Sequence, residues 1–178
     1  MGRQRVRLKT KYLTVSAMLA ALSVVILMLG SLVDVLDITT AVAASVLCIY
    51  AVIEMGGFYP WMIWLTTSIL AFLLLPMKTP AIFYAMFAGF YPILKEKLEK
   101  LKNPISWILK LVVFHVCLAG MVGLLYLFVP GLFMVGGMWW LPAATYLLAV
   151  GCFVIYDIAL TKVITMYLIK FRKRFHIK

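Results

Sequence analysis

Charged residues are scarce in this chain, and acidic ones are scarcest. Of 178 residues, 13% are charged, only 6 are Asp or Glu, and 66% are apolar or aromatic. A soluble domain is usually about a quarter charged and about half apolar. This chain lacks the polar surface to cover a globule, which argues against a water-soluble enzyme. Disordered chains need the opposite composition. The composition therefore predicts a polytopic membrane protein.

Catalytic and metal-binding motifs are also lacking. The chain has no Gly-rich phosphate loop, no metal-spaced set of His and Cys, and no nucleophile elbow. The cysteines Cys48, Cys117 and Cys152 each fall near the middle of an apolar run, where a thiol behaves as a small apolar residue. We therefore expect no enzyme activity, no cofactor and no metal site, and an intramembrane enzyme is the least favoured alternative.

Long apolar runs are what the sequence does contain. A helix needs about 20 residues to cross a bilayer. Six runs approach that length, at 12–33, 38–55, 58–75, 80–94, 105–129 and 138–160. The last stays apolar to about residue 169, so we expect it to leave the membrane near Leu160 and to lead into a basic tail, 161–178. The predicted fold is all-α: a single domain of six transmembrane helices joined by short loops.

Helix-start and helix-stop residues fall at the ends of these runs. Asp37 is placed to cap the second helix, and Thr79 to cap the fourth, with Pro80 at its first helical position. Gly56-Gly57 is placed to end the second helix.

The basic residues indicate the orientation, because cytoplasmic flanks of membrane helices are enriched in Lys and Arg. With the N-terminus inside, the outer loops contain only Lys78, and Lys110 and Lys162 lie in or beside spans. All the others fall on the inner side: Arg3, Arg5, Arg7, Lys9, Lys11, Lys95, Lys97, Lys100, Lys102, Lys170, Arg172, Lys173, Arg174 and Lys178. We therefore predict that both termini are cytoplasmic. This topology accounts for the net charge of +11 without a nucleic-acid partner.

Few ionisable residues fall within the predicted spans. His115 is about mid-membrane, where it either contacts a ligand or relays protons, or is a neutral histidine bonded to a neighbouring helix. Glu54 and Asp157 lie near cytoplasmic ends and can pair with each other, with Lys110 or with a partner protein.

The first outer loop is acidic. Asp34 and Asp37 give the outer face a small negative patch. One interpretation is a helix cap at Asp37 and a solvated turn at Asp34. The other is a ligand contact at the mouth of a cavity.

Aromatic residues cluster at two levels. Trp61, Trp64, Tyr91 and Trp107 fall near the inner interface, and Trp139 and Trp140 near the outer one. An aromatic belt accounts for most of them. Tyr84 and Tyr146 lie deeper, in the outer third of their spans, where they can stack on a flat ligand. Together with Trp139 and Trp140 they are candidate ligand contacts.

Small residues recur at a spacing of four. Ala17 and Ala21 share one face of the first span, within two turns of the cytoplasmic surface. Ala81, Ala85 and Gly89 do so in the fourth. Such faces let helices approach closely. We interpret the fourth-span set as internal packing and the first-span pair as a place for a docking partner.

The opening Leu13-Thr14-Val15-Ser16-Ala17-Met18-Leu19-Ala20-Ala21-Leu22 resembles the start of substrate-binding S components of energy-coupling factor (ECF) transporters. These bacterial and archaeal plasma-membrane proteins have about this length, six spans and cytoplasmic termini. Their first span commonly carries an Ala-x-x-x-Ala face that docks on a transmembrane coupling subunit, and Ala17 and Ala21 match it. The resemblance covers the whole chain in topology and the first span in motif.

The resemblance implies capture of a vitamin or another small micronutrient from outside. A coupling subunit and two ATPases would drive its release inside, so this chain would need no ATP site of its own. Asp34 to Asp37 sits where many members place substrate-contacting or gating residues. The ligand set of the thiamine, riboflavin or biotin members is not recognisable here, which leaves the substrate open. The alternative is a non-transporting scaffold that resembles the rod-shape membrane subunit of cell-wall assembly.

Overall fold

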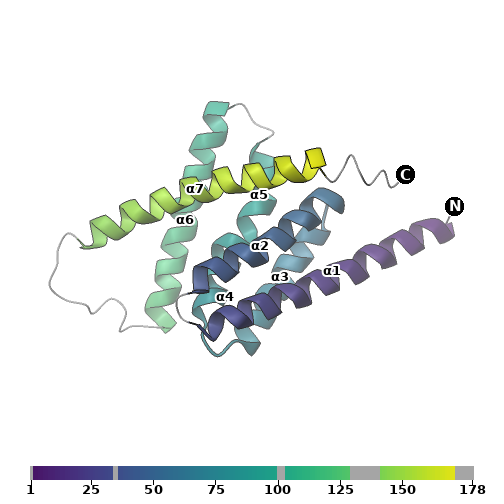
Figure 1. The fold of residues 1–178 in the computed structure, drawn as a ribbon, viewed down its shortest axis with the longest axis horizontal. Helices are drawn as coiled ribbons and strands as arrows, with labels where there is room; N and C mark the ends of the chain where they lie inside the picture. Colours follow the sequence, from purple (N-terminus) through teal and green to yellow (C-terminus); the bar gives the residue numbers. More distant parts are fainter. Residues whose placement is uncertain (1, 34–35, 100–102, 129–140, 171–178) are drawn as a thin grey trace. The chain divides into compact units, whose positions relative to one another are not determined.

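The structure is a computed structural model that describes residues 2–33, 36–99, 103–128 and 141–170, and every regular element in these ranges is helical (Figure 1). The chain divides into two compact units, residues 1–132 and 133–178. The all-α prediction is confirmed for the described residues. Asp34, Trp139 and Trp140 lie outside them.

The first unit contains seven of the helical segments. They are α1 (Gly2–Ser31), α2 (Asp37–Glu54), α3 (Tyr59–Leu74), α4 (Thr79–Phe83), the π-helical turn η2 (Tyr84–Ala88), α5 (Phe90–Leu98) and α6 (Asn103–Phe128). The second unit contains α7 (Leu141–Lys170). Figure 1 shows α1, α2 and α3 side by side, with consecutive helices running in opposite directions.

Four of the described helices are long and apolar enough to cross a membrane. These stretches are Lys9–Ser31, Asp37–Glu54, Ile105–Leu124 and Ala143–Ile169. The helix α3 is apolar but has only 16 residues. The segment from α4 to α5 is interrupted by the turn η2. The structure therefore has the helices of a membrane protein, while two of the six predicted spans are shorter or irregular.

The ends of α2 and α3 lie within one residue of the predicted runs 38–55 and 58–75, whereas α1 begins earlier, at Gly2, and α7 continues to Lys170. Gly56 and Gly57 have φ angles of +57° and +60°, a conformation that favours glycine, and they end α2 as predicted. The two predicted side-chain caps are wrong. The helix α2 begins at Asp37 and α4 at Thr79, so each residue lies in the first turn, and neither helix has a side-chain cap hydrogen bond. In that position the Asp37 carboxylate can still interact favourably with the positive end of the helix dipole.

Small residues let the first helices pack closely. The helix α2 buries Ala41, Ala44, Ser45, Cys48 and Ala51 on one face. Because a Cβ added to Gly30 of α1 would overlap the Thr40 side chain of α2, only glycine fits at that contact. Backbones that approach this closely leave little space between helices, which suits association in a bilayer.

Candidate functional site

One face of α1 is left uncovered by the helices of its own unit. The buried side chains of α1 include Ser16, Ala20, Val24 and Leu27. Ala17 and Ala21, one turn apart, are both exposed. Large apolar neighbours share this exposure, among them Leu13, Met18, Leu22 and Val25. The small-residue pair identified in the sequence therefore lies on an apolar surface that lipid or another protein can cover.

The π-helical turn η2 is held by a bond from another helix. The amide of Gly89 donates to the carbonyl of Tyr84 at 2.8 Å, the spacing of a π turn. The indole N–H of Trp64 on α3 donates to the carbonyl of Ala85 at 2.9 Å. The thiol of Cys48 on α2 lies 3.4 Å from the carbonyl of Gly89. Side chains of two neighbouring helices thus satisfy carbonyls in the irregular segment.

Tyr84 is enclosed by this packing. Its side chain is 0% exposed and belongs to a core cluster with Leu27, Ala44 and Ala71. A Cβ on Gly89 would lie 2.7 Å from Tyr84 Cζ and 2.8 Å from Trp64 Cδ1, so the two rings close over the glycine. A ligand can therefore reach Tyr84 only if the helices around it separate. Ala81 and Gly89 are buried as well, in line with the internal packing predicted for this segment.

The other candidate ligand residues lie in different surroundings. Asp37 is half-buried at the start of α2. His115 is exposed on α6, and its Nδ1 lies 2.7 Å from the carbonyl of Leu111 in the same helix. Tyr146 is 44% exposed and belongs to the second unit. Asp37 and His115 lie on different helices of the first unit, and a ligand site built from these candidates stays a prediction.

A layer of tryptophan and lysine marks one end of the first unit. Lys97 Nζ lies 5.6 Å from the centre of the Trp61 ring, which joins the end of α5 to the start of α3. Lys110 Nζ lies 5.4 Å from the centre of the Trp107 ring on α6. Both distances are typical of cation–π contacts. Tyr12 and Tyr59 meet edge to face at 5.5 Å, so α1 reaches the same end at Tyr12.

Sequence reasoning missed these pairs. It placed Trp61 and Trp107 at an interface but gave them no cationic partners. Trp107 and Lys110 are three residues apart on one helix, so the sequence alone is enough to predict their contact. The contact of Trp61 with Lys97 depends on how α3 and α5 pack, and no local sequence pattern predicts it.

The same end of the unit contains two buried lysines that share one carboxylate. Glu99 Oε1 lies 3.2 Å from Lys95 Nζ and 3.5 Å from Lys110 Nζ. Lys95 is fully buried, and Glu99 is partly exposed. Buried charges need such partners because desolvation is costly. Lys110 therefore has a partner in Glu99 that sequence reasoning did not consider.

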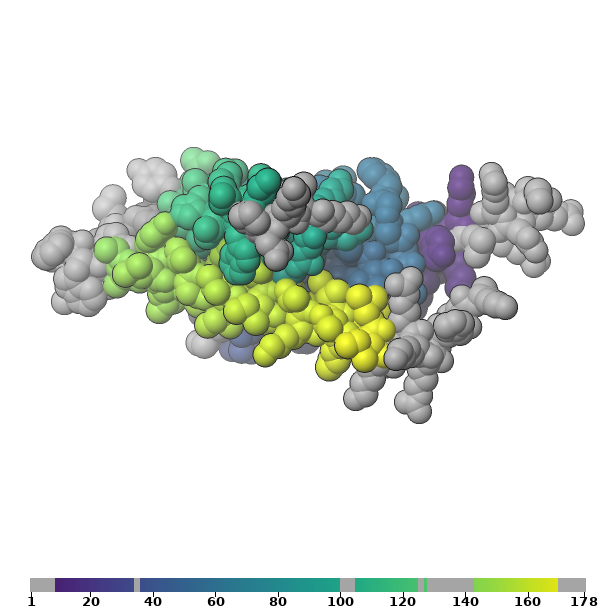
Figure 2. Space-filling model, turned by 90° about the horizontal axis from the view of Figure 1, so that it is seen from above, coloured from purple at the N-terminus to yellow at the C-terminus, as the bar shows by residue number. Residues whose placement is uncertain are grey.

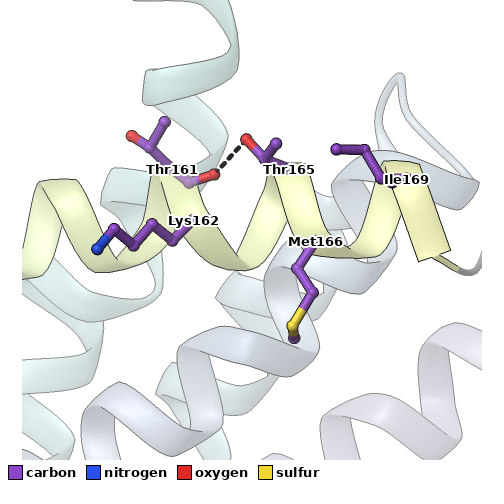
Figure 3. A pocket seen from close by; sticks show the side chains of 5 residues that line it. All are labelled: Thr161, Lys162, Thr165, Met166 and Ile169. Carbon is purple, nitrogen blue, oxygen red and sulfur yellow. Dashed lines mark hydrogen bonds between the residues drawn. The ribbon is translucent and has the colours of Figure 1, made fainter.

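An open depression of about 700 Å³ lies along α7. It is lined by Thr161, Lys162, Thr165, Met166 and Ile169, all from that helix (Figure 3). The Thr165 hydroxyl donates to the carbonyl of Thr161 at 2.7 Å, and the Thr161 hydroxyl to that of Asp157 at 2.9 Å. Both hydroxyls are thus engaged by their own backbone.

Most of the other exposed side chains of α7 are apolar. Its side chains form an unbroken green-to-yellow row in Figure 2, and the large exposed ones include Leu147, Leu148 and Ile155. Among the described residues of the whole chain, no three His, Cys, Asp or Glu side chains gather as a metal site would require. The described surfaces thus offer helix faces for lipid or protein.

Comparison with known proteins identifies no relative. No family model, no curated protein and no solved structure matches the chain.

Proposed function

We propose that the chain crosses the bilayer six times, with both termini in the cytoplasm. Four described helices have the length and composition of spans. The 16 residues of α3 reach about 24 Å, and a hydrophobic segment that short is accommodated by local thinning of the bilayer. Thr79–Leu98 would form the remaining crossing. The concentration of Lys and Arg at one side supports the orientation.

We further propose that this subunit captures a small micronutrient for an ECF-type uptake transporter in a bacterial or archaeal plasma membrane. The observation that carries the proposal is the exposure of Ala17 and Ala21 on α1. A coupling subunit can approach the α1 backbone closely there, because both side chains are small and the other helices of the first unit leave them exposed. The coupling subunit and its ATPases would supply the energy, and this chain the ligand site.

The ligand site in this proposal lies at the outer ends of the helices. Asp34 and Asp37 would stand at its mouth, and Tyr84, His115, Trp139, Trp140 and Tyr146 are its further candidate contacts. Because Tyr84 is enclosed, ligand entry would require a helix to move. The π turn at Tyr84–Ala88 is a place where the helix is already irregular, and such turns are frequent at functional sites.

A scaffold that binds other membrane proteins and transports nothing is the second candidate. The enclosed packing of Tyr84 against Leu27, Ala44 and Ala71 favours it, because a capture subunit needs a cavity in that half of the molecule. The exposed apolar faces of α1 and α7 suit a scaffold equally well.

Co-purification with an ECF coupling subunit tests the docking face. The double variant Ala17→Leu/Ala21→Leu places bulk on that face. The matched control Ala43→Leu/Ala119→Leu makes the same change at exposed alanines of α2 and α6. We expect the first variant to lose the coupling subunit while remaining folded, and the control to retain it. Equal retention by both variants would contradict docking at this face.

A further inference from the structure

The end of the first unit that carries Trp61 also carries exposed positive charge. Lys97 is exposed on the last turn of α5, and Lys9 and Lys11 are exposed on α1 just before Tyr12. The ring contact of Tyr12 with Tyr59 brings that part of α1 to the start of α3, two residues from Trp61. Several cations and a tryptophan thus meet at one level of the unit.

The two lysines near a tryptophan differ in what they can offer. Lys110 is buried and lies 3.5 Å from the Glu99 carboxylate. Lys97 is exposed and lies over the Trp61 ring, which itself packs edge to face against Phe90 at 5.7 Å. The ring fixes the position of the ammonium without neutralising it, because a cation–π contact adds no formal negative charge. The Lys97 ammonium is therefore positioned by the Trp61 ring and remains accessible from solvent.

Neighbouring carboxylates weaken this positive charge only in part. Glu96 precedes Lys97 and is exposed, and Glu99 lies within ion-pair distance of Lys95 and Lys110. The described lysines at this end are Lys9, Lys11, Lys95, Lys97 and Lys110, and its described carboxylates are Glu96, Glu99 and Glu54 at the end of α2. The net charge of the described side chains at this end is therefore positive.

We propose that Trp61 and Lys97 form a binding site for the phosphate of an anionic lipid headgroup. An ammonium has three N–H donors, and the side turned away from the indole can donate to phosphate oxygens. An indole ring is amphipathic, and tryptophan is therefore enriched at the level of the lipid headgroups. Lys9 and Lys11 would add long-range attraction to an anionic leaflet. The site is independent of any transported ligand.

Phosphate occurs both on lipids and free in water, and the experiment separates the two sources. The detergent-purified full chain is titrated with phosphatidylglycerol, with phosphatidylcholine and with inorganic phosphate. Bound lipid is counted by native mass spectrometry, and the unfolding temperature is followed in parallel, since a ligand of the folded state raises it. We expect phosphatidylglycerol to be retained in preference to phosphatidylcholine, and inorganic phosphate to shift neither readout.

Single substitutions test whether Lys97 and Trp61 form the lipid site. Lys97→Gln should weaken phosphatidylglycerol binding about five-fold, which corresponds to the ~1 kcal/mol that one basic residue contributes near an anionic surface. Lys97→Arg should retain binding. Trp61→Phe preserves the packing with Phe90 but weakens the cation–π contact, so it should lower affinity as well. Lys78→Gln removes the same charge at the opposite end of α3, where Lys78 Nζ donates to the carbonyls of Phe72 and Leu75, and it should leave the amount of bound phosphatidylglycerol unchanged.

Three results would overturn the assignment. Unchanged binding by Lys97→Gln would exclude the residue. Equal weakening by Lys97→Gln and Lys78→Gln would show an effect of net charge alone. A shift produced by inorganic phosphate that matches the lipid would show a free-anion site in place of a headgroup site.

Discussion

The indole N–H of Trp64 donates to the backbone carbonyl of Ala85 at 2.9 Å. A π turn leaves a carbonyl without its usual helical partner, and here a side chain from α3 supplies the donor. The bond ties the irregular middle of Thr79–Leu98 to the preceding helix, α3. It also fixes the indole beside Gly89, where the Tyr84 ring closes over the glycine.

Trp64→Phe removes this donor and keeps most of the ring. We expect the free energy of unfolding to fall by about 1–3 kcal/mol, because the Ala85 carbonyl would be left unsatisfied in an apolar core. Unfolding in mixed micelles with increasing denaturing detergent measures the change. Trp107→Phe, at a residue that is 45% exposed, is the control and should cost much less. Equal losses in both variants would show that the bond contributes little.

Gly89→Ala tests the close packing of the same region. The added methyl would lie within 3 Å of atoms of both Tyr84 and Trp64, and overpacking of this kind typically costs about 1–3 kcal/mol. Gly123→Ala is the control, since a Cβ there meets nothing within 4 Å in the helix α6. It should be neutral or stabilising by up to about 1 kcal/mol, because alanine is the better helix former. The prediction fails if Gly89→Ala is as stable as Gly123→Ala.

Thr67 has a buried hydroxyl for which the described residues offer no hydrogen-bond partner. Replacing it with valine removes the polar atom at nearly constant volume. We expect Thr67→Val to be neutral or to stabilise the protein by about 1 kcal/mol, because an unsatisfied buried group is costly. The neighbouring Ser68 hydroxyl donates to the carbonyl of Trp64 at 2.7 Å, so its removal in Ser68→Ala should destabilise instead. Destabilisation by Thr67→Val comparable to that by Ser68→Ala would show that the hydroxyl is satisfied.

The proposed orientation can be tested at the two ends of α3. Phe58 and Met77 are both exposed, and each can be replaced by cysteine in a chain whose own Cys48, Cys117 and Cys152 are changed to alanine. A membrane-impermeant thiol reagent should label Met77→Cys in intact cells. It should label Phe58→Cys only after permeabilisation. The reverse pattern would place the termini outside.

The helices themselves were predictable because their signals are local. Long apolar runs predicted an all-helical membrane protein, and Gly56-Gly57 ended α2 where the sequence indicated. The caps at Asp37 and Thr79 were wrong because each helix starts one residue earlier than the side chain suggested. Helix ends fray and their boundaries vary by one or two residues, so a local capping pattern does not fix the first residue of a helix.

The candidate site was less predictable because it depends on packing between helices. Small residues occur on both sides of α1, and only the structure separates the buried Ala20 from the exposed Ala17 and Ala21. The carbonyl of Ala85 in the π turn accepts a hydrogen bond from Trp64 of another helix, and no propensity within Tyr84–Ala88 predicts the turn. The sequence places Tyr84 in the outer third of a predicted span, but the enclosure of its ring depends on residues of α1, α2 and α3.

Ligand binding by the purified chain tests the central proposal most directly. A thermal-shift screen in detergent against a panel of vitamins and their precursors detects any compound that binds the folded state, because such a compound raises the unfolding temperature. At a ligand concentration 100 times the Kd, the stabilisation is about 2.7 kcal/mol. Capture predicts that one compound class gives a saturable increase, and that Asp37→Asn or Tyr146→Ala reduces it. A panel that leaves the unfolding temperature unchanged throughout would contradict capture and favour the scaffold.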